Sequence, residues 1–402
     1  MDILIRNHLY KSIASSSSSN IFYVAFFIYS FSSVLQLTNF VNLSYLHLDF
    51  IYQVARIVAA LLLIFILFLR RYPYDEFFLI VALGVVCLIS VIQSGYWDLM
   101  ISFLFIFSSN GIKISRLSKI AFFEYLFIFI GTAVASKIGF IQDIKNPDAK
   151  GQIKESLGFT HPNTLAAVAF ALCCSYAIMN MGRMLKKDLI IYAIGFYICW
   201  SIAKSRTSAL TLIIFVIFMY VCNNSQKILR MHVIKLIAFI FLFLVFFSII
   251  CMIFFDPNSL FFKCINDALS GRLEFSHHYY ELYGIHPFGF NFDNVDVSYV
   301  YLGANYKKLV IDNAFCFLLL QAGWIPSLIF FYLYFMTLLK SSKCKDSYIF
   351  LGMMIYAIAS YTEGYSLWFS FNYSMIGIYY LYKQNRKFQI GQQDLCTSSS
   401  VI

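Results

Sequence analysis

The residues best able to do chemistry stand in a few short polar segments of a chain that is otherwise strongly apolar. One segment, Ala-Lys-Ser-Arg-Thr-Ser, places Lys204 and Arg206 at the start of an apolar run. Arginine offers a planar fork of donors to phosphate, and a helix N-terminus adds backbone amides. We interpret this turn as an anion-binding site. The alternative is that both side chains only extend to lipid phosphates.

A long polar stretch, residues 256–311, carries most of the other candidates. In it, Arg272 and Glu274 precede His277, and His286 follows in the turn-rich segment Gly-Ile-His-Pro-Phe-Gly-Phe. The spacing of Arg272 and His277 fits one or two helical turns. This pattern suits an arginine that holds pyrophosphate beside a histidine or an acid. A metal site is disfavoured, because adjacent histidines on a helix point apart.

Two residue pairs directly precede apolar runs. In His-Pro-Asn-Thr, the proline ends a loop and Asn163 is expected to cap the next helix, while His161 could also bind a sugar or phosphate. Asp312 and Asn313 begin a later run, where either residue makes a good helix cap. Asp312 also stands where an outer active site needs a base. For each pair, helix capping and a direct role at a functional site both remain open.

Arg56 is a charge inside an apolar run, near the outer end of that run. A charge at such a depth is rare, and it either faces a cavity or extends to the interface. Glu124 is the obvious partner, but it lies near the inner end of its own run. We therefore expect Arg56 to face the outer side and not to pair with Glu124.

The composition shows which solvent the chain needs. It is 60% hydrophobic and only 12% charged, so lipid rather than water must cover its surface. The net charge of +10 comes as pairs and triplets of basic residues between apolar runs, which is typical of membrane orientation signals and not of nucleic-acid binding. The ten cysteines include no C-x-x-C pair, which argues against a zinc site or a disulfide framework.

Apolar runs of suitable length predict about twelve transmembrane helices. The predicted spans are 21–43, 51–69, 77–93, 97–110, 120–141, 163–181, 188–203, 207–223, 233–255, 312–338, 347–362 and 366–382. The fold class that follows is an all-α integral membrane protein with one large external loop.

The basic residues orient these spans. With the N-terminus in the cytoplasm, every second connection is basic, as the positive-inside rule requires. Both termini are then cytoplasmic, and the two longest connections, 142–162 and 256–311, are external. The expected parts are a cytoplasmic tail, nine spans, the large external loop, three spans and a second cytoplasmic tail, at 1–20, 21–255, 256–311, 312–382 and 383–402.

Four local motifs occur in a recognisable order: Gly-Phe-Thr-His-Pro-Asn at 158–163, Ser-Arg-Thr-Ser at 205–208, Ser-Gly-Arg at 270–272 with His-Pro-Phe-Gly-Phe at 286–290, and Asp-Asn at 312–313 followed by Gly323. With these motifs and its layout of spans, the chain resembles the O-antigen polymerase and O-antigen ligase superfamily of bacterial surface-polysaccharide assembly. The matched motifs cover roughly residues 150–330.

The resemblance implies a lipid-carrier-dependent glycosyltransferase (GT-C type) in the bacterial inner membrane. Its donor would be a glycan on undecaprenyl pyrophosphate, and its reaction would need no metal or other cofactor. The implied partners are that lipid-linked glycan, membrane lipid, and a chain-length regulator and flippase of the same pathway, with no nucleic acid.

Site roles follow from this chemistry. Charge builds on the leaving pyrophosphate, which arginines can stabilise, and the acceptor hydroxyl gains from a base. The expected catalytic residues are Arg272, Arg206, Asp312, Glu274 and His286. The expected binding residues are Arg56, Lys204, His161, Asn163, His277 and Asn313.

One position departs from the family pattern. Ligases of the superfamily typically carry a histidine before the asparagine that starts the span after the large loop, whereas this chain has Asp312. We therefore expect a polymerase of repeat units, with an O-antigen ligase as the alternative. A flippase or transporter would favour charged residues spread through the middle of the membrane. A structural or sensor protein would not need basic residues on the outer side.

Overall fold

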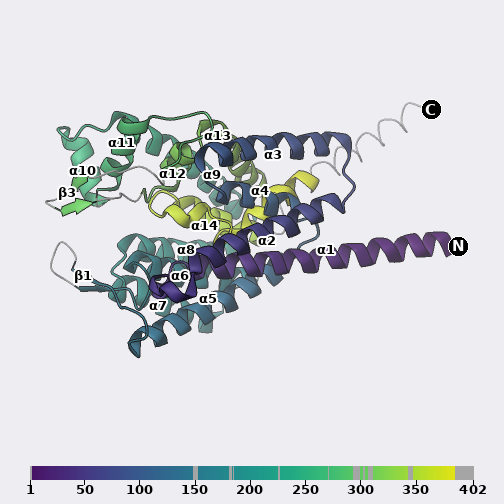
Figure 1. The fold of residues 1–402 in the computed structure, drawn as a ribbon, viewed down its shortest axis with the longest axis horizontal. Coiled ribbons are helices and arrows are strands. Elements are labelled where there is room, and N and C mark those ends of the chain that lie inside the picture. Colours follow the sequence, from purple (N-terminus) through teal and green to yellow (C-terminus); the bar gives the residue numbers. More distant parts are fainter. Residues whose placement is uncertain are drawn as a thin grey trace.

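The computed structural model describes residues 2–147, 153–180, 183, 185–224, 227–269, 271–292, 299–301, 304–306, 311–342 and 347–384. These residues are mostly helical (Figure 1). Strands occur among them only as two antiparallel hairpins, which pair β1 (Lys145–Pro147) with β2 (Ile153–Glu155) and β3 (Tyr299–Tyr301) with β4 (Ala304–Tyr306). The predicted all-α membrane architecture is confirmed.

Seven helices in the described part of the chain are long and apolar enough to cross a membrane. They are α1 (Asp2–Leu35), α2 (Leu48–Phe68), α3 (Tyr74–Ser94), α5 (Ile114–Lys137), α6 (Pro162–Met179), α9 (Lys227–Phe254) and α13 (Trp324–Ser341). Shorter apolar helices are α4 (Asp98–Ser108), α7 (Leu189–Tyr197) with the π-helical turn η4 (Ile198–Ile202), α8 (Arg206–Asn224) and α14 (Leu351–Ala359). The short turns η3 (Lys186–Asp188) and η5 (Ser347–Phe350) precede α7 and α14. The protein therefore passes through a membrane several times. Helices of about 20 apolar residues are long enough to span the hydrocarbon core, and they satisfy the hydrogen bonds of their backbone internally.

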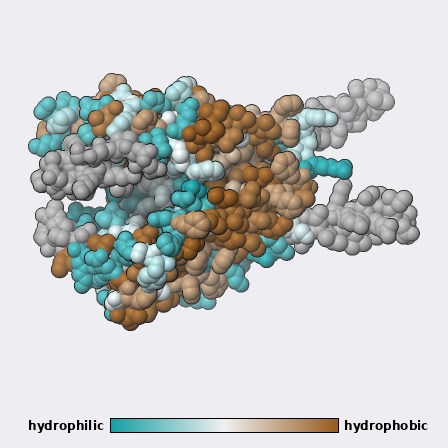
Figure 2. Space-filling view, viewed as in Figure 1, coloured by the Kyte–Doolittle hydropathy of each residue, from teal (hydrophilic) through white to brown (hydrophobic). Residues whose placement is uncertain are grey.

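Large apolar side chains cover the outside of the helix bundle. Phe78 on α3, Phe127 on α5 and Phe243 on α9 are 68%, 69% and 62% exposed. Figure 2 shows such side chains as a broad band, with hydrophilic side chains gathered toward one end of the molecule. A surface of this kind suits acyl chains and would be unfavourable in water.

The two ends of the bundle differ (Figure 1). One end, here called the loop end, carries the hairpins together with α10 (Leu260–Ala268) and α11 (Arg272–Tyr283). The other, the terminal end, is where α1 begins. There Lys383 Nζ pairs with Glu76 Oε2 at the head of α3, at 2.7 Å. The first and last described parts of the chain therefore lie at the same end, and both long predicted external connections lie at the other.

The first predicted span, 21–43, extends too far. Helix α1 ends at Leu35, and two 3-10 turns follow, η1 (Asn39–Asn42) and η2 (Ser44–Leu46). Asn39 Nδ2 donates to the carbonyls of Gln142 and Phe159, at 2.7 and 3.1 Å. Polar side chains after Leu35 bond to backbone groups outside the helix, and this competes with helix continuation.

The predicted span 312–338 is broken into α12 (Ala314–Gln321) and α13. The break is at Gly323, which has φ +97°. A Cβ atom at Gly323 would overlap the backbone of Phe288 and Gly289, and one at Gly289 would overlap the backbone of Gln321. The two glycines thus cross closely and hold the external loop against the α12–α13 break.

The last predicted span, 366–382, is not one continuous helix. It begins within the 3-10 turn η6 (Gly364–Leu367) and contains the 3-10 turn η7 (Tyr373–Ile376), and helix resumes only at 377. The segment lies in the hydrophobic core of the bundle, where Tyr373 and Ile376 are buried. Asn372 Nδ2 donates to the Tyr334 hydroxyl at 3.0 Å and so supports the irregular backbone. Non-helical backbone is tolerated at membrane depth when protein surrounds it.

Candidate functional site

Asn313 is the residue that caps α12. Its side-chain oxygen accepts hydrogen bonds from the backbone of Phe315 and Cys316, at 3.0 and 3.1 Å. Its amide nitrogen donates to Ser248 Oγ on α9 at 2.9 Å, and the side chain is buried. Asn313 therefore anchors the helix, and its neighbour Asp312 is not needed as a cap.

Arg272 pairs with Asp312 at the loop end. Gly271, with φ +84°, starts α11, so that Arg272 is the first residue of the helix. Arg272 Nε donates to Asp312 Oδ2 at 2.9 Å, and the two side chains are 10% and 32% exposed. Burial acts to lower the pKa of Arg272, but Asp312 and Glu363 reverse this effect and raise it. The guanidinium is therefore a permanent cation.

Glu363 completes this group, which we call the acid–arginine cluster (Arg272, Asp312 and Glu363). It lies between α14 and η6 and is only 5% exposed. Thr207 and Ser208 donate to its Oε1 at 2.8 and 3.2 Å. Burial raises the pKa of Glu363, and the nearby Arg272 opposes that effect. Arg272 thus pairs with Asp312 and is close enough to Glu363 to interact with it electrostatically.

Sequence reasoning missed Glu363. The signal that could have found it is a lone acidic residue directly after the predicted span 347–362. Its neighbour Tyr365 donates to Glu363 Oε2 at 2.5 Å and also approaches the Asn163 carbonyl at 3.5 Å. These contacts join the final segment of the chain to the head of α6.

The turn that carries Lys204 and Arg206 lies against the acid–arginine cluster. It follows the π-helical turn η4, and Lys204 has φ +50°, which is unusual for a lysine. Thr207 and Ser208, the next two residues, are the donors to Glu363. Arg206 is exposed and forms no ion pair with another described residue. The turn therefore presents a free cation beside the cluster.

His161 is the residue that caps α6, and the expectation that Asn163 would be the cap is wrong. His161 Nδ1 accepts from the Asn163 backbone at 3.1 Å, while Thr164 Oγ1 accepts from the His161 backbone at 3.1 Å. The intervening Pro162 occupies the first helical position, which moves the cap one residue before it. Burial lowers the pKa of His161, and Asp312 and Arg272 lie close enough to affect its charge in opposite directions.

Three predicted residues of the large loop have local structural partners instead. Glu274 and Asn266 exchange hydrogen bonds at 2.9 and 3.2 Å, which link α11 to α10. His277 Nδ1 lies 2.7 Å from the Met252 carbonyl and bridges α11 to α9. His286 is exposed, and its Nε2 lies 2.8 Å from the Tyr283 carbonyl. Glu274, His277 and His286 thus bond to groups outside the acid–arginine cluster.

Arg56 belongs to a different cluster. Its guanidinium lies over the rings of Tyr52 and Trp97, 5.3 Å from each centroid. The nearby Asp98 accepts from Tyr29 and Tyr52 at 3.0 and 3.2 Å. Asp98 attracts Arg56 electrostatically, which makes it a partner of Arg56 that the sequence did not indicate. Arg56 therefore fits a structural role between α2 and α4.

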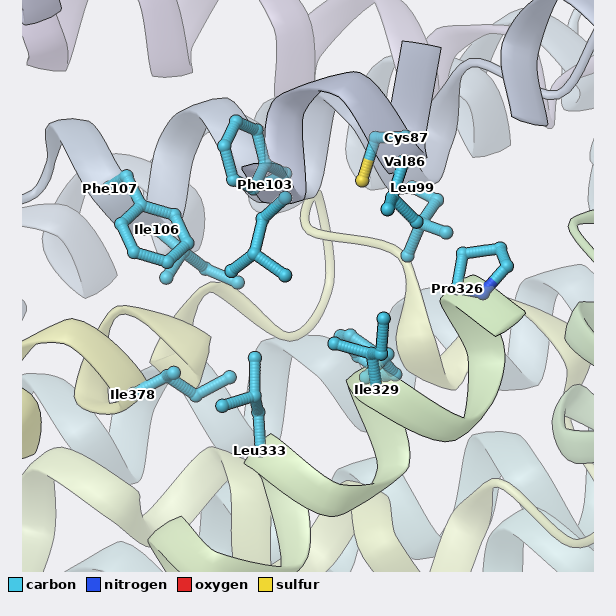
Figure 3. A pocket seen from close by; sticks show the side chains of 12 residues that line it. Val86, Cys87, Leu99, Phe103, Ile106, Phe107, Pro326, Ile329, Leu333 and Ile378 are labelled. Atoms are coloured by element: carbon cyan, nitrogen blue, oxygen red, sulfur yellow. The ribbon is translucent and has the colours of Figure 1, made fainter. Parts of the chain in front are cut away.

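An apolar cavity of about 40 Å³ lies between α3, α4 and α13. Figure 3 shows its lining, which includes Cys87, Phe103 and Ile329 and no charged side chain. Such a lining can contact hydrocarbon but offers no group for proton transfer or anion binding. The acid–arginine cluster, in contrast, combines a buried cation, two carboxyl groups and several hydroxyls. It can hold an anion and accept a proton.

No group of three or more His, Cys, Asp and Glu residues in the described part of the chain is arranged to hold a metal ion. No protein-family model, curated protein or solved structure matches this chain.

Proposed function

We propose that this chain is a polysaccharide polymerase. It would join undecaprenyl-pyrophosphate-linked repeat units into O-antigen or capsular polysaccharide on the outer side of the bacterial inner membrane. The observation that carries the proposal is the acid–arginine cluster, which lies at the loop end of an apolar helix bundle. A substrate with a polyprenyl tail and a charged, sugar-bearing head needs both environments next to each other.

Arg272 suits the leaving group of this reaction. An acceptor hydroxyl oxygen bonds to the anomeric carbon of the donor while the bond from that carbon to the pyrophosphate oxygen breaks. Negative charge then grows on the pyrophosphate, and a preorganised guanidinium stabilises it. Nε of Arg272 is held by Asp312, and neither Nη group donates to another described residue. Both Nη groups therefore remain for the pyrophosphate.

Asp312 suits the base. Its side chain is about a third exposed, so an acceptor hydroxyl can reach it, whereas Glu363 is buried. The hydroxyl proton passes to the Asp312 carboxylate as the new glycosidic bond forms. The pairing with Arg272 keeps the carboxylate oriented toward the same place as the guanidinium.

Glu363 acts as a positioning residue in this proposal. It accepts hydrogen bonds from Thr207, Ser208 and Tyr365, and so ties the head of α8 to the turn before η6. Arg206 and Lys204 stand on the same turn as Thr207. They provide a second cationic contact for the pyrophosphate or for a charged sugar.

The proposal includes twelve crossings with both termini in the cytoplasm. The last crossing would be the segment between Glu363, which interacts electrostatically with Arg272 at the loop end, and Lys383, which pairs with Glu76 at the terminal end. That segment joins the two ends of the bundle although it is not one continuous helix. The fold class of lipid-carrier-dependent glycosyltransferases is part of the same proposal.

The decisive experiment uses the full chain in lipid nanodiscs with one purified undecaprenyl-pyrophosphate-linked repeat unit as the sole substrate. The expected products are dimers and longer oligomers on the carrier, with release of undecaprenyl pyrophosphate. Arg272→Gln should lower elongation by roughly 10²–10³-fold. Lys263→Gln removes an exposed cation from the same loop and serves as the matched control.

A deletion strain separates the proposal from the ligase alternative. Cells without the chain should still display single repeat units at the surface, because ligation continues. Loss of every repeat unit from the surface would instead identify a ligase. If well-folded protein formed no product longer than the supplied repeat unit, the polymerase assignment would be overturned.

A further inference from the structure

The terminal end of the bundle contains an open hollow of about 960 Å³. Its wall comes from four separate parts of the chain: α1, the turn between α2 and α3, the turn between α4 and α5, and the helical segment at 377–384. Among the described residues, its lining includes no acidic side chain and five basic ones: Arg70, Arg71, Lys113, Arg116 and Lys383. We call this feature the basic hollow.

Three of the five cations are held in place by the surrounding protein. Arg70 donates to the carbonyls of Ser108 and Asn110, at 2.8 and 3.0 Å. Arg116 lies 4.3 Å from the centroid of the Tyr23 ring. Lys383 pairs with the buried Glu76. These contacts give the wall a defined shape before any ligand binds.

The other two cations are available. In the described part of the chain, neither the Arg71 guanidinium nor the Lys113 ammonium forms an ion pair or a side-chain hydrogen bond. Like charges around one hollow repel each other, and an anion relieves that repulsion. Among the described residues, the charges of Arg71 and Lys113 in the hollow are therefore not paired with an acidic side chain.

An orientation signal alone does not explain this arrangement. The positive-inside rule depends on how many basic residues a connection carries and not on where their side chains gather. Lys119 shows the difference, because it is exposed on α5 and belongs to the same basic group as Lys113 and Arg116 but does not line the hollow. The gathering of cations from four chain segments is a separate feature that needs its own explanation.

The surroundings of the hollow indicate the kind of anion. Large apolar side chains stand beside its basic turn: Phe68 is 84% exposed, Leu69 54% and Tyr74 86%. Such side chains at the end of a membrane helix contact acyl chains and headgroups. A ligand with apolar tails and a phosphate head would satisfy the apolar rim and the cations together.

We propose that the basic hollow binds the phosphate headgroup of an anionic membrane phospholipid, in the leaflet opposite the acid–arginine cluster. Arg71 and Lys113 contact the phosphate, while the acyl chains lie along the ends of α2 and α3. The site is separate from polymerisation and does not depend on that proposal. The same phosphate chemistry could be offered by a free glycerol phosphate, which the experiment distinguishes.

The test is native mass spectrometry of the full chain released from nanodiscs of mixed phosphatidylglycerol and phosphatidylcholine. Wild-type protein should retain phosphatidylglycerol in preference to phosphatidylcholine. The double variant Arg71→Gln/Lys113→Gln should retain roughly 25-fold less, at about fivefold for each cation removed near an anionic surface. Lys119→Gln/Lys187→Gln removes the same charge from exposed positions outside the hollow and should behave as wild type.

Equal retention by wild type and both double variants would overturn the site, as would equal losses in both variants. A second arm supplies sn-glycerol 1-phosphate to the protein in phosphatidylcholine nanodiscs. Failure of this soluble phosphate to bind supports a lipid as the source. Binding of it at Arg71 and Lys113 without retention of phosphatidylglycerol would overturn the lipid assignment.

Discussion

Arg272 Nε donates to Asp312 Oδ2 across 2.9 Å, although the two residues are 40 positions apart in the chain. The pair exists because Asn313, and not Asp312, caps α12. It also requires α11 to begin at Arg272, directly after the left-handed Gly271. A helix start and a helix cap together bring a cation from the large loop to an acid at the edge of the bundle.

Replacing Arg272 tests the proposed pyrophosphate contact. Arg272→Gln should lower polymer formation by roughly 10²–10³-fold, because one preorganised donor group to the leaving oxygen is lost. Arg272→Lys should restore little, since an ammonium lacks the planar fork that serves Asp312 and a phosphate at once. Polymer length on gels reports the result, with Lys263→Gln as the control. Normal polymer from Arg272→Gln would remove Arg272 from the mechanism.

Asp312 and Asn313 should separate activity from stability. Asp312→Asn keeps the shape of the side chain and an acceptor for Arg272 Nε but removes the charge, so elongation should fall far more than thermal stability. Asn313→Ala should lower the free energy of unfolding by about 1 kcal/mol from the lost cap, and more from the lost bond to Ser248. Thermal unfolding in detergent and oligomer synthesis are measured on both variants. The reverse pattern would contradict the assignment of cap and base.

Glu363 should make stability depend on pH in a defined direction. Burial raises its pKa in the folded protein, so the folded state binds a proton more tightly than the unfolded state. Its contribution to stability is full below the ordinary carboxyl pKa and is lost as pH rises through the raised value. Wild type should therefore lose stability over that window relative to Glu363→Gln. Melting temperatures of both proteins across pH measure the difference, and parallel curves would refute it.

His161 should act on substrate as well as on α6. Asparagine is a good helix cap, so His161→Asn should fold as wild type, whereas His161→Ala should lose about 1 kcal/mol of stability. His161 lies near Asp312 and Arg272, so we expect His161→Asn to lower elongation by about tenfold. Elongation kinetics alongside melting temperatures separate the two effects. Full activity in the asparagine variant would leave His161 with the capping role alone.

Gly323 should be intolerant of a side chain. A Cβ atom there would overlap the backbone of Phe288 and Gly289, so Gly323→Ala should detach the external loop from the α12–α13 break. Limited proteolysis of the loop should be faster, and the yield of folded protein lower. Gly284→Ala is the control, because Gly284 also has positive φ (+67°) but no atom near a built Cβ. Equal effects in both variants would show that backbone strain, and not the close crossing, is responsible.

The sequence by itself determined the solvent of this protein and the position of most helices. Hydropathy acts locally, because a run of about 20 apolar residues must satisfy its backbone within itself in lipid. The bounds of α3 and α9 therefore lie close to the predicted spans 77–93 and 233–255. The order of polar motifs also identified Arg272 and Asp312 as candidates.

Only the tertiary structure decided which candidates meet. Glu363 contacts Thr207 across 156 positions, and Asn313 rather than Asp312 caps α12, a choice that both residue types allow in sequence. The segment 366–382 is apolar enough for a helix, yet its first half is irregular, which is tolerated because protein surrounds it. A pairing between distant residues depends on how helices pack, and no local pattern of residues contains that information. The Arg272–Asp312 pair is thus a property of the folded bundle, built from residues whose types alone left several partners open.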